Sequence, residues 1–400
     1  MARVTATLAL LLALAVATAG PLGARAARVP STDRLVIAAA DAAADAAADA
    51  AAAAAPAAAK DAAPAPAPLP VVLWHGMGDS CCALGSIGGV AKFLESRLGV
   101  FVHSVATGEG ELRDVASSFY GNVNDQVAAA CAALRALPGE LSGGFNMVGF
   151  SQGGQFLRAV VQRCGHELPG PVHTLVTMGA QHMGVSNAPA CSGVGAAGPA
   201  AAACAAVESA LSAGAYSPWV RDHIVQAQYF KSPADYGEYL ANNVFLPDVN
   251  NEVEASRSRS YKRNLSALER LVLYRFAEDT VVEPSASSHF GFWDVADEGD
   301  DEAADDGGEA AAPGRPPRRT PERRIVPLGE SALYKEDWLG LRALDERGAL
   351  VMATAPGEHM QFRMRWFEEE VVDKWLAKGP EGGWLERARA EQQQRAAAAP

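Results

Sequence analysis

The chain has 400 residues, of which 49% are hydrophobic and 20% charged, so it is long enough for one large globular domain or two smaller ones. Its formal net charge of −13 argues against the basic surface that nucleic-acid-binding proteins carry, and we expect no nucleic-acid partner. Its six cysteines form an even number, which is compatible with three disulfide bonds in an oxidising compartment.

The N-terminus has the pattern of a secretory signal peptide. Arg3 precedes an uncharged apolar run from Leu8 to Ala17, and Ala17-Thr18-Ala19 offers small residues to a signal peptidase. This run is too short to span a bilayer, so we predict a signal peptide over residues 1–26 and no transmembrane segment. An organelle transit peptide is the alternative, because the first 32 residues contain several arginines and no acid.

Three further segments have a composition that is typical of linkers and disordered regions, which bury little surface. Residues 27–68 are dominated by Ala with Asp and then Pro, which predicts a linker. Residues 297–324 form an acidic run followed by a Pro/Arg stretch, for which we expect a disordered insertion. Residues 379–400 are polar and Ala-rich, and a disordered tail is expected there. The folded domain is therefore expected over residues 69–378.

Within that domain, strand and helix patterns alternate. Apolar runs predict six strands, at Val71–Trp74, Val100–Val105, Phe145–Val148, Thr174–Met178, Leu271–Phe276 and Leu350–Ala353. Apolar residues at helical spacing predict helices over 123–137, from Gly154 onward, and over 366–376. This order indicates a parallel α/β sheet. Residues 183–268 carry few strand signals, and we expect this insertion above the carboxyl ends of the strands, where ligands bind.

Residues Gly149–Gly153 have the G-x-S-x-G pattern of a nucleophile elbow. The pattern alone is weak, since the chain contains 38 glycines. Its context strengthens it, because an apolar strand precedes Ser151 and a helix-like run follows. Glycines are needed on both sides of such a serine, where a Cβ would collide with the neighbouring strand and helix. Ser151 is therefore the candidate nucleophile.

A serine hydroxyl needs a base and an acid, and in α/β-hydrolases they follow the serine in the order acid, then histidine. His359 lies in a loop directly after the last strand, whereas His289 has no strand before it, so His359 is the candidate base. Asp279 and Glu278 both follow the strand from Leu271, and Asp279 leads on position. A third carboxylate, in Pro247-Asp248-Val249-Asn250, lacks a preceding strand.

The oxyanion of an acyl-transfer intermediate needs two backbone N–H donors. One comes from the residue after the nucleophile, here Gln152, and the other from the loop after the first strand. That loop is His75-Gly76-Met77-Gly78, in which Met77 is the natural donor. We interpret His75 as a structural residue beside the site.

At these residues the chain resembles the palmitoyl-protein thioesterases, most closely the lysosomal type 1 enzymes. The matched strings are Trp74–Cys82, Gly149–Val160, Gly179–Val185 and Ala213–Ser217. The resemblance implies an α/β-hydrolase fold, with helices on both faces of a mostly parallel sheet and a lipid-binding, cap-like insertion. The family's nucleophile, acid, base and oxyanion donors fall on Ser151, Asp279, His359, Met77 and Gln152.

The resemblance also implies the reaction, which is hydrolysis of the thioesters that join long-chain fatty acids to protein cysteines. Its substrates are S-palmitoylated proteins or peptides and other acyl thioesters, and it needs no metal or organic cofactor. Two alternatives remain from the residues alone: a lipid-ester lipase with the same triad, and a non-catalytic acyl-binding protein. The oligomeric state stays open.

The six cysteines fall on family positions, which implies the pairs Cys81–Cys82, Cys131–Cys164 and Cys191–Cys204. Consecutive Cα atoms lie about 3.8 Å apart, below the usual disulfide range of about 4.4–6.8 Å, so two free thiols are the alternative at Cys81 and Cys82.

The resemblance further implies a lysosomal or vacuolar glycoprotein that travels the secretory pathway. One plain glycosylation sequon is present, Asn264-Leu265-Ser266, and it lies in a helical-looking stretch. Secretion therefore remains an alternative destination.

Overall fold

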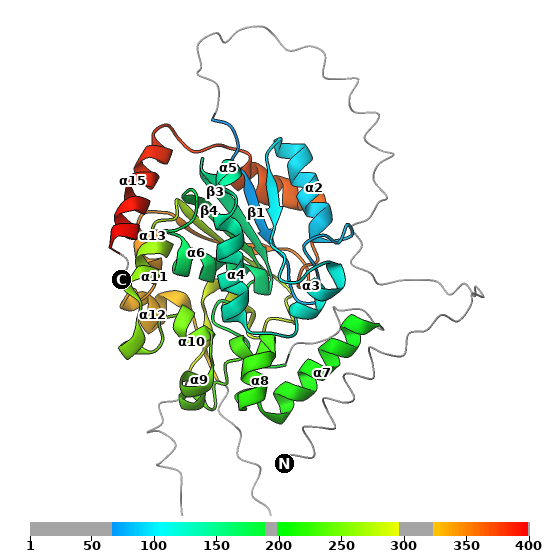
Figure 1. The fold of residues 1–400 in the computed structure, drawn as a ribbon. Coiled ribbons are helices and arrows are strands. Elements are labelled where there is room, and N and C mark those ends of the chain that lie inside the picture. Colours follow the sequence, from blue (N-terminus) through cyan, green and yellow to red (C-terminus); the bar gives the residue numbers. More distant parts are fainter. Residues whose placement is uncertain (1–65, 189–197, 296–322, 399–400) are drawn as a thin grey trace, which may run out of the picture. The chain divides into compact units, whose positions relative to one another are not determined.

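The computed structural model describes residues 66–188, 198–295 and 323–398. At its centre is a six-stranded sheet with the strand order β2-β1-β3-β4-β5-β8, in which every neighbouring pair is parallel (Figure 1). The strands are β1 (Val71–Trp74), β2 (Val102–Ser104), β3 (Phe145–Phe150), β4 (Val172–Met178), β5 (Arg270–Phe276) and β8 (Leu350–Ala355). All six expected strands are present, with ends that differ by a few residues.

The central strands are apolar throughout because both faces of the sheet are covered. In β1, Val72 and Trp74 belong to one buried cluster, whereas Val71 and Leu73 belong to another on the opposite face. Every residue of β3 and of β4 is buried. This is the pattern of a parallel sheet between two helical layers. β8 alternates instead and leaves Met352 exposed, because it is an edge strand.

One helical layer consists of α4 (Val123–Arg135), α6 (Gln152–Cys164) and α11 (Arg259–Leu265), and in Figure 1 α4 and α6 lie in front of the strands. The other contains α2 (Ile87–Leu98), α14 (Met364–Phe367) and the π-helix η8 (Glu368–Leu376). Two expected bounds shift. α6 begins at Gln152, directly after the serine, and α4 ends before Leu137, after which Pro138 starts the short helix α5 (Pro138–Leu141). The sheet and its two layers form an α/β-hydrolase fold.

Between β4 and β5 the described residues form helices, as the scarcity of strand signals predicts. Before α11 these are α7 (Pro199–Gly214), α8 (Pro218–His223), η3 (Val225–Tyr229), α9 (Tyr236–Asn242), α10 (Leu246–Val249) and η4 (Glu254–Ser256). Apolar residues of α7, α8 and η3 pack with Phe119, which follows α3 (Glu111–Ser117). Part of the insertion thus shares a small core with the segment around α3.

A smaller excursion separates β5 from β8. It contains η5 (Ser285–His289), β6 (Phe292–Trp293), β7 (Ile325–Val326), η7 (Leu328–Glu330), α12 (Ala332–Lys335) and α13 (Leu341–Glu346). β6 and β7 pair antiparallel and bring together the two ends of the segment expected as a disordered insertion. Residues 297–322 of that segment lie outside the described residues, as do the expected signal peptide and residues 27–65 of the expected linker.

The expectation of a disordered C-terminal tail is wrong for residues 384–397, which form α15 (Trp384–Ala397). The polar composition hid one anchoring residue. Trp384 is buried, packs edge-on against His173 with 4.7 Å between ring centroids, and contacts Leu69. Further along the helix, Gln392 Nε2 donates hydrogen bonds to the carbonyl oxygens of Gly165 and Leu168. These contacts hold the helix against the domain.

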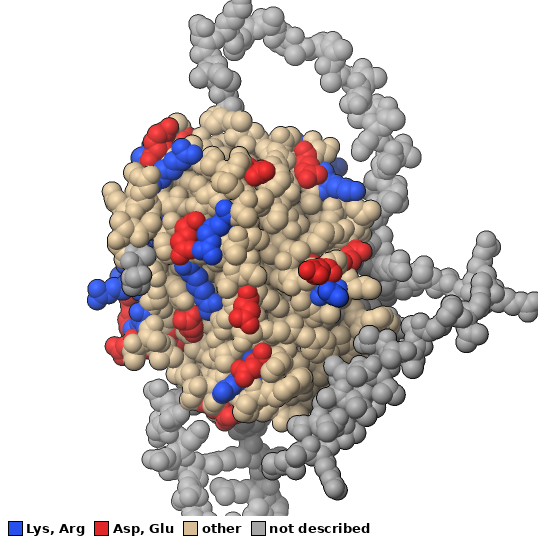
Figure 2. Space-filling model, viewed as in Figure 1, with Lys and Arg blue, Asp and Glu red and all other residues tan. Residues whose placement is uncertain are grey.

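On the face that Figure 2 shows, basic and acidic side chains lie mostly in adjacent pairs, separated by broad uncharged surface. Among the described residues, Arg163 and Asp248 form an ion pair at 2.7 Å. Among the described residues, no helix is both long enough and apolar enough to cross a membrane.

Candidate active site

Ser151 sits on a tight turn between β3 and α6. Its φ of 52° is unusual for a residue with a side chain, and its N–H donates to the carbonyl oxygen of Met178 at 2.8 Å. The two flanking glycines are required by close approaches. A Cβ on Gly149 would lie 2.3 Å from Gly154 Cα, and one on Gly153 would lie 2.4 Å from the carbonyl oxygen of Trp74. The turn therefore excludes a side chain at positions 149 and 153.

Three residues from three loops form a continuous hydrogen-bonded chain. His359 Nε2 lies 2.9 Å from Ser151 Oγ, and His359 Nδ1 lies 2.8 Å from Asp279 Oδ2. The second carboxylate oxygen of Asp279 accepts hydrogen bonds from the N–H groups of Val281 and Val282 at 3.0 and 2.9 Å. The loops follow β3, β5 and β8, so all three residues meet at the carboxyl edge of the parallel sheet.

The other candidates lie elsewhere. His289 Nε2 lies within hydrogen-bonding distance of the carbonyl oxygens of Leu273 and Ala353 instead of a serine. Asp248 accepts from Arg163 and Tyr261, which belong to other helices. Glu278 is exposed beside Asp279. The geometry therefore selects Asp279 and His359 from the alternatives that the sequence offered.

The expected oxyanion donors flank the serine. A Cβ on Gly76 would lie 3.1 Å from Ser151 Cβ, so the loop after β1 runs directly against the nucleophile. Among the described residues, no acceptor is hydrogen-bonded to the backbone N–H of Met77 or to that of Gln152. Gln152 is the first residue of α6, where an N–H has no partner within the helix. Both N–H groups are thus available to a ligand oxygen.

The side chain of Gln152 joins the site to the insertion, which sequence reasoning missed. Its Nε2 donates to the carbonyl oxygen of Ser118 at 3.0 Å, and its Oε1 accepts from the hydroxyl of Tyr229 at 3.0 Å. Gln226 Nε2 donates to the same Ser118 oxygen at 2.9 Å. Tyr229 lies among the aromatic residues of the insertion, but no motif in the sequence marks it or Ser118.

Known proteins match the chain across this whole arrangement. The family model described as palmitoyl protein thioesterase matches residues 70–359, a range that contains the sheet and all the candidate residues. The chain belongs to the palmitoyl protein thioesterase family.

Individual relatives agree with that membership. Palmitoyl-protein thioesterase 1 of Caenorhabditis elegans is 38% identical over 307 residues, which cover 76% of this chain and 91% of that protein. A palmitoyl-protein thioesterase-dolichyl pyrophosphate phosphatase fusion of Schizosaccharomyces pombe is 30% identical over 76% of this chain, but only 44% of the fusion is covered. Among solved structures, esterase LipW of Mycobacterium marinum is 14% identical over 84% of this chain and 74% of that one, with a TM-score of 0.34. We base no conclusion on this similarity.

Two of the disulfide bonds expected for a palmitoyl protein thioesterase are present. Cys81 and Cys82 are joined although their Cα atoms are 3.8 Å apart. Cys131 in α4 and Cys164 in α6 are joined at a Cα–Cα distance of 6.2 Å, which ties two helices of one layer together. The third expected bond, Cys191–Cys204, involves Cys191, which lies outside the described residues.

The expected glycosylation position is contradicted by its surroundings. Asn264 is only 5% exposed within α11, and its Nδ2 donates to the carbonyl oxygen of Gln162 at 2.9 Å. The same nitrogen lies 3.0 Å from His166 Nδ1. A glycan would have to leave from this nitrogen through packed protein, so the folded domain does not accommodate one at Asn264.

The buried His182 packs in the core of the domain. His182 stacks on Phe290 with 4.6 Å between centroids, and burial, together with the charge of Arg158, lowers the pKa of its imidazole well below 6.5. Phe290 is itself buried and belongs to the hydrophobic core. Burial also lowers the pKa of Arg158 to about 9. Within the described ranges, no group of three or more His, Cys, Asp or Glu residues is placed to hold a metal ion.

Proposed function

We propose that this chain hydrolyses the thioester bond between a long-chain fatty acyl group, such as palmitate, and a protein cysteine, with Ser151, His359 and Asp279 as its catalytic residues. The observation that carries the proposal is the hydrogen-bonded chain from Ser151 Oγ through His359 to Asp279, at distances of 2.9 and 2.8 Å. Family membership supplies the substrate class, because the relatives are named palmitoyl-protein thioesterases.

In the acylation step His359 Nε2 takes the hydroxyl proton as Ser151 Oγ bonds to the thioester carbonyl carbon. The tetrahedral intermediate carries a negative oxygen, which the N–H groups of Met77 and Gln152 stabilise. As the C–S bond breaks, the imidazolium of His359 returns its proton to the departing thiolate. The product cysteine leaves and the acyl group stays on the serine.

In the deacylation step the same groups act on water. His359 takes a proton from water as its oxygen attacks the acyl-serine carbonyl, and then returns the proton to Ser151 Oγ when that bond breaks. The free fatty acid leaves. Asp279 orients the imidazole ring of His359 and stabilises its positive charge. Two backbone N–H groups that donate hydrogen bonds to Asp279 Oδ1 hold this carboxylate in place.

The substrate reaches this centre from the side of the insertion. Tyr229 and Gln226 of η3 lie directly against Gln152, so the helices between β4 and β5 border the position of the acyl carbonyl. An apolar surface in this region would accommodate a long acyl chain, while the protein thiol would face solvent.

Replacement of Ser151 tests the assignment. We expect Ser151→Ala to lower the rate on a palmitoylated peptide thioester by about 10⁴-fold or more and to abolish labelling by a fluorophosphonate probe. The exposed Ser212→Ala on α7 is the control and should keep both. A Ser151→Ala protein as active as the wild type would refute the triad.

Matched substrates test the leaving group. Palmitoyl esters of a thiol and of an alcohol with the same remainder should be cleaved with a preference for the thioester. A preference for the oxygen ester would indicate a lipid-ester lipase. An unlabelled but folded wild-type protein would indicate an acyl-binding protein without catalysis.

We further propose a lysosomal location, reached through the secretory pathway. Related proteins from Xenopus laevis and Bos taurus are named lysosomal thioesterases, and residues 1–26 have the composition of a secretory signal peptide. Residues 27–68 would then be a linker, and residues 297–324 an insertion in the catalytic domain. Deleting residues 1–26 should leave the protein in the cytosol, whereas unchanged lysosomal delivery would contradict the proposal.

A further inference from the structure

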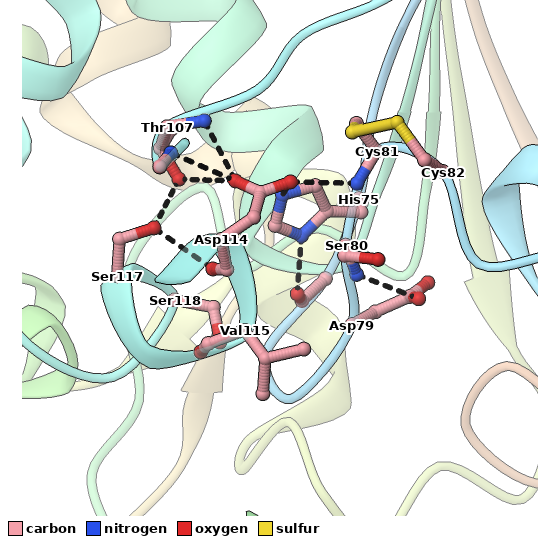
Figure 3. Close-up of polar contacts among 12 residues, drawn as sticks. His75, Asp79, Ser80, Cys81, Cys82, Thr107, Asp114, Val115, Ser117 and Ser118 are labelled. Atoms are coloured by element: carbon pink, nitrogen blue, oxygen red, sulfur yellow. Dashed lines mark hydrogen bonds and ion pairs between the residues drawn. A yellow bond between two sulfur atoms is a disulfide. The ribbon is translucent and has the colours of Figure 1, made fainter. Parts of the chain in front are cut away.

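The expected oxyanion donor Met77 belongs to a peptide unit that a neighbouring side chain holds in place. His75 Nδ1 lies 2.9 Å from the carbonyl oxygen of Gly76 (Figure 3). This oxygen and the N–H of Met77 are part of the same planar peptide group. A hydrogen bond that fixes the direction of the C=O therefore also fixes the direction of the N–H, and it polarises that N–H toward stronger donation.

The ring of His75 is itself held by a carboxylate. His75 is 1% exposed and Asp114 is fully buried, and Nε2 lies 3.3 Å from Asp114 Oδ2. Each ring nitrogen thus faces an acceptor oxygen, and only a protonated imidazole donates from both nitrogens. Burial alone would lower the pKa of His75. The contact with the charged carboxylate of Asp114 outweighs this effect, together with the Gly76 carbonyl and the charge of Asp79, and the pKa of His75 is raised above 6.5.

Asp114 is anchored from several directions. Its Oδ1 accepts from the N–H and hydroxyl of Thr107 at 2.7 and 2.9 Å and from the N–H of Gly108 at 3.2 Å. Its Oδ2 accepts from the N–H of Cys81 at 2.7 Å. Burial would raise the pKa of Asp114, yet His75 and these N–H groups lower it to about 2, so the carboxylate stays ionised in acid.

A second contact holds the peptide unit on the other side of Met77. The N–H of Gly78 donates to Ser118 Oγ at 2.8 Å, and Ser118 directly follows α3. The carbonyl oxygen of the same serine accepts from Gln152 Nε2 at 3.0 Å. Ser118 therefore contacts Gly78, the residue after the donor Met77, and the side chain of the other donor, Gln152.

We infer that His75 and Asp114 are positioning residues for oxyanion stabilisation: the buried pair orients the Gly76–Met77 peptide so that the Met77 N–H points at the developing oxyanion. The inference rests on the proposed function, in which Met77 is a donor. It assigns a role in the reaction to a pair that the elbow motif does not include. A purely structural pair would hold the loop without affecting the transition state in particular.

Two replacements of His75 separate these roles. The amide nitrogen of Asn occupies the position of Nδ1 and keeps a donor for the Gly76 carbonyl, whereas that of Gln occupies the position of Nε2. We expect His75→Gln to lower kcat about 30-fold, less than the 10²–10³-fold loss of a whole oxyanion donor. His75→Asn should stay within about 5-fold of wild type, and KM should change little in both. Equal kcat values for the two variants, with equal stability, would overturn the inference.

Replacement of two adjacent serines provides a second test that keeps the side chains of both His75 and Asp114. Ser118→Ala removes the acceptor of the Gly78 N–H, and we expect kcat to fall about 5-fold. Ser117→Ala is the matched control, because its hydroxyl contacts Thr107 and Asp114 but not the loop of Met77. Its kcat should stay within about 2-fold of wild type. Equal kcat values for Ser118→Ala and Ser117→Ala would contradict the inference. This comparison can be made even if His75→Gln does not fold.

Binding of a long-chain trifluoromethyl ketone gives a readout independent of the thioester. Its adduct with Ser151 carries the oxyanion, so His75→Gln should weaken its binding about 30-fold while binding of the product palmitate is unchanged. Equal weakening of both ligands would indicate a structural role and overturn the inference. A wild-type protein that binds the ketone but cleaves no thioester would refute the proposed function and leave this inference standing.

Discussion

The carbonyl oxygen of Ser118 accepts a hydrogen bond from Nε2 of Gln152 at 3.0 Å. Ser118 follows a short helix after β2, whereas Gln152 opens the helix after β3. The contact ties the elbow to the segment that also holds the loop of Met77. The two expected oxyanion donors therefore share one support, and several variants of that support should affect catalysis more than stability.

The orienting acid is the most direct prediction. Asp279→Asn should lower kcat by about 10⁴-fold with little change in KM, because an amide favours the wrong tautomer of His359 and does not stabilise the imidazolium. Glu278→Gln is the control, since its side chain is exposed next to Asp279. Steady-state kinetics on a palmitoyl thioester would measure both. A larger loss for Glu278→Gln would show that the acid has been misassigned.

Removal of the Tyr229 hydroxyl should weaken the support of Gln152. In Tyr229→Phe, Gln152 Oε1 keeps only the bond from Gln226 at 3.2 Å, so kcat should fall about 3-fold and the free energy of unfolding by about 1 kcal/mol. Tyr261→Phe, which loses a 3.0 Å bond to Asp248 away from the site, should lose similar stability without loss of kcat. Urea unfolding and kinetics on both proteins would decide, and identical kcat values would argue against a link between η3 and catalysis.

The His75–Asp114 pair should make stability depend on pH. The pKa of His75 is raised above 6.5, so its contribution is complete below 6.5 and is lost as pH rises through the raised value. The pKa of Asp114 is lowered from 3.8 to about 2, so its contribution is complete above 3.8 and is lost as pH falls toward 2. The pair therefore stabilises the domain most in mildly acidic solution.

Urea unfolding of wild type and His75→Asn at about pH 5 and about pH 9 would test this dependence. The replaced side chain changes packing equally at both values, so the difference in stability between the two proteins should be larger at the acidic one. A difference that does not vary with pH would contradict a charged His75.

The C-terminal helix should be part of the folded domain. Trp384→Ala should lower the free energy of unfolding by about 3 kcal/mol, because it empties the space between His173 and Leu69. Activity of the folded protein should be unchanged. Arg387→Ala, on the exposed side of the same helix, should change stability by less than about 0.5 kcal/mol. Equal stability of the two variants would mean that α15 does not anchor to the domain.

The arrangement of the three proposed catalytic residues was predictable because chain order and sheet geometry are coupled. Ser151 is marked by its glycines, and loops that follow parallel strands emerge at one edge, so His359 could be chosen over His289 by its preceding strand alone. The choice between Asp279 and Glu278 depended on which carboxylate turns inward, and the structure decided it at 2.8 Å from His359.

Other features depended on contacts that no local pattern encodes. Polar composition predicted a disordered tail, yet a single tryptophan docks α15, because burial of one large ring stabilises a helix that is otherwise polar. Asn264 carries a sequon, yet its amide is buried between two helices. Sequons and composition report on short stretches of chain, and burial is decided by segments far away.

By itself, the sequence determined the α/β class and the family and predicted the proposed nucleophile and base, since each follows from local periodicity or from the order of motifs along the chain. Only the tertiary structure decided the partners of the oxyanion loop. His75 and Asp114 are 39 positions apart in the sequence and meet because β1 pairs with β2 in the sheet, so that the segments following these two strands lie close together. Such a contact depends on the distance between the two groups in space, and that distance is set by the packing of the whole domain.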